Sequence, residues 1–422
     1  MNTEFREKMK RFNGYYGKSI TKLEDLYQKR GASFACSYDV NTNYFTEVYK
    51  LLEAYGEQSG KIGLLFYSVE NDSLRTWFIN KHSFIEKDIA FPTDSLVQLE
   101  FDIRRSLEVD RRSLDKAIIS RGAVLGTPSK EAKPSLTKTI QKATNILLPK
   151  EFRIGLEKVE HLLIIPEFNI GQIPFHILQP FEQGVYLVDR LSYSFVPHLC
   201  QVSQFIDDEM NLGTPRSLSQ KNPLVVGNPQ FSQNLDLRLV PLPAAEQEAR
   251  EISSLLGTTA IVGKLATVDT IIELSKKADL LYFATHGYFD FDKLLDGSFL
   301  AFAPSNSYPD GLWRARSIQN LRLKASLAIL SACQTGYGKV YSGGFIGIGR
   351  AFFKAGVKDV ILSLWSVDDE KTKELMIEFI KQLQQPSLYF PAGALQKAIL
   401  SSKAKNPNPI YWAPFASFGF TY

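Results

Sequence analysis

DLLYFATHG, residues 279–287, is an apolar run that ends in a threonine, a histidine and a glycine. A short continuous apolar run of this kind is typical of a strand buried on both faces of a parallel sheet. SLAILSAC, residues 326–333, has the same form and ends in a cysteine. Each predicted strand delivers a reactive side chain to its carboxyl end, which is the edge where open α/β sheets bind ligands. The two segments therefore predict both a fold class and the place of a functional site.

The sequence around these segments alternates between strand-like and helix-like patterns. PLVVGNP (223–229) and DVILSLW (359–365) are further apolar runs with the pattern of buried strands. One helical pattern ends at Gly257, and another begins after Thr267, which we expect to be its N-cap. Strands that alternate with helices predict a mainly parallel sheet with right-handed crossovers.

The first half of the chain predicts a smaller α/β unit. Residues 61–81 indicate two strands around the turn Asn71-Asp72, and residues 161–168 indicate one buried strand. The polar stretch 207–222 contains glycine, proline and serine and suggests a boundary. We therefore expect three parts, namely a short N-terminal helical segment (1–60), a first half (61–215) and a second half (216–422).

Composition indicates a globular protein of the cytoplasm. The chain has 49 basic and 45 acidic residues, so its net charge of +4 gives no reason to expect nucleic acid or an anionic membrane as a partner. Cys36, Cys200 and Cys333 are odd in number and far apart, which favours a reducing compartment over a disulfide framework. The sequence shows no signal-peptide pattern and no apolar run of the ~20 residues that span a bilayer.

His286 and Cys333 have the chemistry of a base and a nucleophile. They lie 333 − 286 = 47 positions apart, enough for a crossover that makes their strands neighbours. A cysteine attacks as the thiolate, and an imidazole can take its proton and later protonate a leaving amine. The backbone N–H groups of Gly287 and Cys333 are candidates for an oxyanion hole. Taken alone, a cysteine at the end of an apolar strand is more often a buried, inert residue.

Several motifs resemble those of the CHAT domain family of caspase-like (clan CD) cysteine peptidases. YFATHG (282–287) and LSACQTG (330–336) resemble the family's histidine and cysteine motifs. Residues 343–372 and 410–420 resemble the stretches that follow its cysteine, although Gln334 stands where many relatives have glutamate. The resemblance implies a caspase-like three-layer α/β/α sandwich with a mainly parallel sheet, preceded by a smaller pseudo-caspase α/β half.

The same resemblance implies a function. A CHAT peptidase is a cysteine endopeptidase with a Cys–His dyad, here Cys333 as nucleophile and His286 as base. The family acts mostly in regulated switching, so we expect one particular protein substrate, such as a gasdermin-like protein or another product of a neighbouring gene, in bacterial antiviral defence or cell death. A protein activator is a further expected partner, and no metal or organic cofactor is implied.

Trp365, Asp368 and Asp369 are the expected substrate pocket. They resemble the W-D-V-T-D pattern of separases, in which Asp369 occupies the position of the carboxylate that recognises the P1 residue, the one just before the cleaved bond. A carboxylate there would favour arginine or lysine. The alternative is that both aspartates cap the following helix.

The sequence alone leaves two alternative functions and the role of one segment open. A non-catalytic scaffold would keep the fold as a binding surface, and a thiol acyl-transferase would ligate peptides rather than hydrolyse them. Residues 289–320 have the pattern of a long loop, which we expect to border the cleft because such loops are often functional.

Overall fold

The computed structural model describes most of the chain as a mixed α/β fold. The described residues are 7, 10–15, 17–18, 48, 52, 61–70, 72–107, 134–196, 222–233, 239–288, 290, 295–332, 348–365, 369–385 and 390–419. Val48 and Leu52 are helical and buried, while most of the N-terminal segment and the proposed boundary near residue 215 lie outside these ranges. The division into parts therefore stays a prediction.

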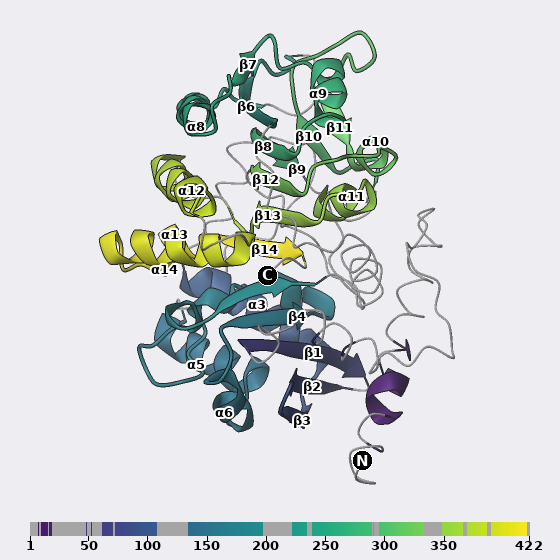
Figure 1. The fold of residues 1–422 in the computed structure, drawn as a ribbon. Coiled ribbons are helices and arrows are strands. Elements are labelled where there is room, and N and C mark those ends of the chain that lie inside the picture. The colour runs from purple at the N-terminus through teal and green to yellow at the C-terminus, as the bar shows by residue number, and fades with distance from the viewer. Residues whose placement is uncertain are drawn as a thin grey trace.

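One large sheet runs through the whole described structure (Figure 1). In spatial order its eleven described strands are β3 (Ser83–Ala90), β2 (Ser73–Asn80), β1 (Ile62–Glu70), β4 (His161–Ile165), β5 (Ser192–Phe195), β14 (Phe415–Gly419), β13 (Asp359–Ser363), β12 (Leu327–Ser331), β8 (Leu280–Ala284), β6 (Pro223–Pro229) and β7 (Ile261–Gly263). Within these ranges the pairs β1–β2, β2–β3 and β13–β14 are antiparallel, and the other neighbours are parallel. The prediction of a mainly parallel sheet is confirmed.

Helices cover both faces of the second half of this sheet, which completes the predicted sandwich. Figure 1 shows α8 (Pro243–Leu255), α12 (Asp369–Leu383) and α13 (Pro391–Lys405) along one side, and α9 (Val268–Ser275), α10 (Ala315–Gln319) and α11 (Ile348–Lys354) along the other. The remaining described helices and 3-10 turns are α3 (Thr93–Ser106), α5 (Leu136–Leu147), η2 (Lys150–Phe152), α6 (Arg153–Leu156), η3 (Phe168–Gln172), η4 (Phe175–Ile177), η5 (Leu187–Asp189) and α14 (Pro409–Trp412).

Local sequence signals set the ends of several elements. The Thr267 side chain accepts a hydrogen bond from the backbone N–H of Thr270, which confirms it as the N-cap of α9. Gly257, just after α8, has a φ of +66°, a conformation that glycine adopts without strain. Gly227 in β6 permits close packing, because a Cβ there would lie 2.4 Å from the carbonyl oxygen of Ala245 and the Cβ of Ala249. Helix α8 is thereby held directly against the sheet.

Residues 289–320 differ from the expected long loop. The described part pairs β9 (Gly287–Tyr288), β10 (Phe299–Ala301) and β11 (Leu312–Arg314) in a small antiparallel sheet that continues into α10. Trp313 of β11 is fully buried, with its ring centroid 5.8 Å from that of Phe352. Strands of two or three residues are too short to show the alternation by which a sequence reveals a strand.

Two histidines of the first half are buried. The rings of His161 and His176 are buried, and burial lowers the pKa of each to about 3. His161 places Nδ1 2.8 Å from the Ser192 hydroxyl, and His176 donates from Nε2 to the carbonyl of Phe415 at 3.1 Å. Both rings are therefore neutral in the folded chain at neutral pH.

Because these two histidines are buried and neutral, the folded chain should become less stable in acid. Below the ordinary histidine pKa of about 6.5 the unfolded chain takes up protons at both sites, while the folded chain does not until the pH nears 3. Each site should therefore lower the free energy of unfolding by ~1.4 kcal/mol per pH unit between those limits. His176→Gln keeps a hydrogen-bond donor for the Phe415 carbonyl and removes the imidazole that takes up a proton in the unfolded chain. Denaturant unfolding from pH 7 to pH 5 should show a shallower pH slope for this variant, and an unchanged slope would contradict the prediction.

Candidate active site

The two strands that carry the predicted dyad lie side by side. β8 and β12 pair in parallel, with Ser331 opposite Ala284. His286 follows Ala284 by two positions, and Cys333 follows Ser331 by two positions. The expected neighbourhood of the two strands is confirmed, while Cys333 itself lies outside the described residues.

The imidazole of His286 is held by a backbone carbonyl. Its Nε2 lies 2.8 Å from the carbonyl oxygen of Val240, in the segment that leads into α8. A carbonyl oxygen only accepts hydrogen bonds, so Nε2 carries the proton and Nδ1 of the neutral ring has a free lone pair. The ring also packs on Phe231, with centroids 4.8 Å apart. The sequence did not reveal this carbonyl, since no side chain marks it.

The surroundings of His286 favour the neutral ring. Only 9% of the residue is exposed, and burial lowers its pKa from the ordinary value, although the Val240 carbonyl acts in the opposite direction. A neutral imidazole at neutral pH can accept a proton. Gly287 opens β9 opposite Leu300, and an oxyanion role for its N–H stays a prediction.

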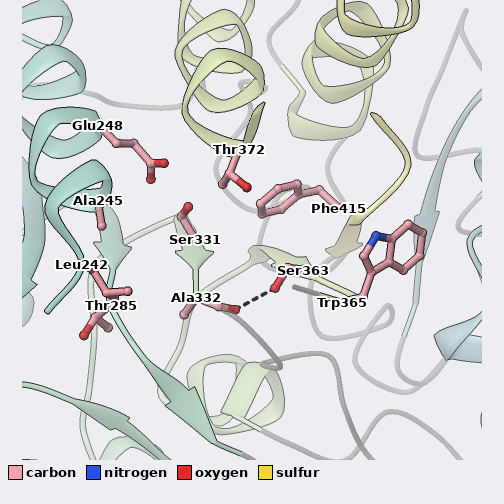
Figure 2. A pocket seen from close by; sticks show the side chains of 10 residues that line it. All are labelled: Leu242, Ala245, Glu248, Thr285, Ser331, Ala332, Ser363, Trp365, Thr372 and Phe415. Atoms are coloured by element: carbon pink, nitrogen blue, oxygen red, sulfur yellow. Dashed lines mark hydrogen bonds between the residues drawn. The ribbon is translucent and has the colours of Figure 1, made fainter. Parts of the chain in front are cut away.

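The peptide that precedes Cys333 is fixed from the next strand. The hydroxyl of Ser363, at the end of β13, donates to the carbonyl of Ala332 at 2.7 Å (Figure 2). This bond ties the turn after β12 to β13. In the sequence Ser363 is part of an apolar run. A serine at the carboxyl end of a buried strand is the signal that could have marked it as a residue of the site.

A pocket opens beside these strand ends. Its volume is small, about 40 Å³, and it is open to solvent. Its lining comes from the start of α8 and α12 and from the ends of β8, β12, β13 and β14, and consists of Leu242, Ala245, Glu248, Thr285, Ser331, Ala332, Ser363, Trp365, Thr372 and Phe415 (Figure 2). Thr285 and Ala332 directly precede His286 and Cys333 in sequence, so the pocket lies at the edge of the sheet where the candidate dyad is expected.

Glu248 brings a carboxylate into this pocket. The residue is 3% exposed, and its Oε1 accepts a hydrogen bond of 2.6 Å from the Tyr282 hydroxyl. Burial and the negative charge of Glu248 raise the pKa of Tyr282 well above its ordinary value. In Figure 2 the polar ends of Glu248, Thr372 and Ser331 point toward one another. Glu248 lies on a helix and had no motif in the sequence that marked it as a site residue.

The three predicted pocket residues have different outcomes. Trp365 lines the pocket, is 1% exposed, and donates from its indole nitrogen to the carbonyl of Ile410 at 3.1 Å. Asp369 is the first residue of α12, and its side chain and the whole of Asp368 lie outside the described part. The substrate and capping hypotheses for these aspartates both remain predictions.

The described residues contain neither a metal-site cluster nor a helix suited to a bilayer. Among them, no cluster of three or more histidine, cysteine, aspartate or glutamate side chains has the arrangement of a metal site. No helix in the same ranges combines the length and the hydrophobicity that crossing a bilayer requires.

The protonation of His286 can be measured directly. In ¹⁵N-labelled protein, the resonance lost in His286→Gln should show a protonated Nε2 and an unprotonated Nδ1 at neutral pH, with a titration midpoint below about 6.5. Phe231→Ala should move that midpoint upward, because it exposes the ring to water. A midpoint at or above 6.5 in the unmodified chain would contradict the assignment of a neutral ring.

Comparison with known sequences identifies relatives of this chain. The model of the CHAT domain matches residues 137–420. Tetratricopeptide repeat protein 28 of Homo sapiens is 28% identical over 293 residues, which are 61% of this chain and 12% of that protein. The same protein of Mus musculus is 26% identical over a stretch of equal length and coverage. The chain thus spans only a small part of the length of these relatives.

Solved structures show the same fold at low identity. One structure of the Saccharomyces cerevisiae separase–securin complex aligns over 95% of this chain and 33% of the other, with a TM-score of 0.56 and 11% identity. A second structure of that complex aligns over 89% and 31%, with a TM-score of 0.55. The fold is therefore the caspase-like fold of separase. Since the family model covers more than half of the sequence, the chain belongs to the CHAT domain family.

Proposed function

We propose that this chain is a cysteine endopeptidase in which Cys333 is the nucleophile and His286 the base. The observation that carries the proposal is the hydrogen bond from His286 Nε2 to Val240, which leaves Nδ1 as the proton acceptor at the carboxyl end of β8. The adjacent strand β12 ends two residues before the cysteine.

The proposed reaction has two steps. Nδ1 of His286 takes the thiol proton of Cys333, and the thiolate attacks the scissile carbonyl. The tetrahedral intermediate collapses to a thioester as His286 returns the proton to the leaving amine. Water, deprotonated by His286, then hydrolyses the thioester and restores the thiol. The N–H groups of Gly287 and Cys333 are proposed to stabilise the oxyanion.

We propose that the pocket beside the dyad takes the P1 side chain of the substrate. The carboxylate of Glu248 lines this pocket and supplies the negative charge with which a cationic side chain would pair. The hydroxyls of Ser331 and Thr372 add polar lining, while Trp365 and Phe415 can pack against an aliphatic stem. A lysine or arginine combines a stem with a cationic end and fits this lining, with Asp369 as a second proposed carboxylate.

The wider role is proposed from the family alone. It comprises a specific protein substrate, such as a gasdermin-like protein or the product of a neighbouring gene, and control by a protein activator in the cytoplasm during bacterial antiviral defence or cell death. Incubation of the purified chain with candidate proteins, followed by mapping of new N-termini against the Cys333→Ala variant, tests this role.

The scaffold alternative makes a different prediction for the thiol. A structural cysteine stays unreactive, whereas a cysteine beside a neutral imidazole should react with iodoacetamide near pH 7. Mass spectrometry of the cleaved products separates hydrolysis from the remaining alternative, peptide ligation.

Removal of either member of the dyad should abolish cleavage. Cys333→Ala and His286→Ala should each lower kcat/KM by roughly 10⁴-fold or more, because neither group can act alone. Cys36→Ala and Cys200→Ala remove the other two thiols and serve as controls. Cleavage of a confirmed substrate by Cys333→Ala at the normal rate would rule out the proposed mechanism.

The charge of Glu248 should govern the choice of the P1 residue. Glu248→Gln keeps the size of the side chain and removes a charge-assisted hydrogen bond, so cleavage after lysine or arginine should fall by about 10–100-fold relative to cleavage after neutral residues. A peptide library analysed by mass spectrometry measures this ratio. Glu251→Gln makes the same change on the exposed side of α8 and should leave the ratio unaltered. An equal ratio in both variants would remove Glu248 from the proposed pocket.

A further inference from the structure

A buried arginine of the first half reaches the strand ends of the second. Arg104 lies in the last turn of α3 and is 7% exposed. Its Nε donates to the carboxylate of Glu100, one turn earlier on the same helix. Its Nη1 donates to the carbonyl oxygen of Leu364 at 2.9 Å, across 260 positions of sequence. The guanidinium therefore bridges α3 and the carboxyl end of β13.

The peptide groups around Leu364 are held from several directions. The N–H of Leu364 donates to the carbonyl of Pro414 at 2.6 Å, and its carbonyl accepts from Arg104. On one side lies Ser363, whose hydroxyl binds the carbonyl of Ala332. On the other side lies Trp365, which lines the pocket. Two hydrogen bonds, joined through the backbone of Ser363 and Leu364, thus link Arg104 to the carbonyl of Ala332.

We propose that Arg104 is a positioning residue for Cys333. The guanidinium holds the carbonyl of Leu364, and the backbone of Leu364 in turn holds its neighbour Ser363 at the end of β13. The Ser363 hydroxyl in turn holds the carbonyl of Ala332, the residue that directly precedes Cys333 in sequence. The first half of the fold thereby contributes to the geometry of a site built by the second half.

Arginine suits this task better than other cations. Its planar fork can bind a carboxylate and a carbonyl at once, and Glu100 fixes the orientation of that fork. A lysine could reach only one acceptor at a time with a defined direction. Reacting groups are sensitive to placement, since a shift of about 1 Å can change a rate by about 10²-fold. A small movement at the end of β13 is therefore enough to alter the reactivity of the thiol.

The experiment measures the alkylation rate of Cys333 in the full chain with iodoacetamide. Mass spectrometry of the tryptic peptides follows Cys333, with Cys36 and Cys200 as internal references. Arg104→Met and Ser363→Ala should each slow the reaction of Cys333 by about tenfold. The double variant should be no slower than the slower single variant, because both changes break one chain of contacts.

Arg105→Met is the matched control. Arg105 occupies the same last turn of α3, and its guanidinium lies over the ring of Phe101 at 5.6 Å. The control removes the same charge from the same helix end and should leave the alkylation of Cys333 at its original rate. Arg104→Lys should give an intermediate rate, and together with Ser363→Ala it carries the test if Arg104→Met does not fold.

Alkylation of Cys333 in folded Arg104→Met at the original rate would overturn the proposal. A slowing in the double variant equal to the product of the two single slowing factors would overturn it as well. The inference rests on the proposed role of Cys333, and the two can fail separately. An unreactive Cys333 in the unmodified chain would count against the peptidase itself. In that case the coupling between Arg104 and Ser363 is measured from melting temperatures. A shift in the double variant equal to the sum of the two single shifts would overturn the contact chain.

Discussion

The parallel pairing of β8 with β12 is the constraint on which the candidate site depends. Its register places Ala284 opposite Ser331, so the residues two positions further on leave the sheet at the same edge. The pairing of β12 with β13 continues this edge to Ser363, whose hydroxyl binds the carbonyl of Ala332. A slip of one residue in either pair would move every side chain to the opposite face. The geometry of the site is thus a property of the strand register.

Contacts between the two halves add to this constraint. Phe418 of β14 pairs with Phe195 of β5, and their rings lie 5.1 Å apart. His176 and Arg104, both from the first half, donate to the carbonyls of Phe415 and Leu364 in the second. One continuous hydrophobic cluster includes residues of both halves. The first half therefore supports the strands that carry the site, although none of its residues lines the described pocket.

The sequence predicted the long, regular elements well and the side-chain arrangement of the site only in part. Buried strands such as 223–229 and 280–284 are continuous apolar runs, and Thr267 is a recognisable cap, so periodicity and local chemistry were sufficient. The short strands β9–β11 and strand β3, which pairs with β2, were not predicted from the sequence. Tertiary contacts rather than a strong local pattern stabilise them. The carbonyl of Val240 and the carboxylate of Glu248 were missed for a different reason. Their importance arises from segments that meet only in the folded chain, and no spacing in the sequence encodes that meeting.

The place of β14 in the sheet has a consequence for biosynthesis. This strand comes after all the other described strands in chain order, yet it lies between β5 and β13, where the two halves join. A polypeptide emerging from the ribosome would expose the open edges of both neighbours until residues 415–419 have left the exit tunnel. The junction can form only after that moment, and every nascent chain that is interrupted earlier carries two unprotected sheet edges.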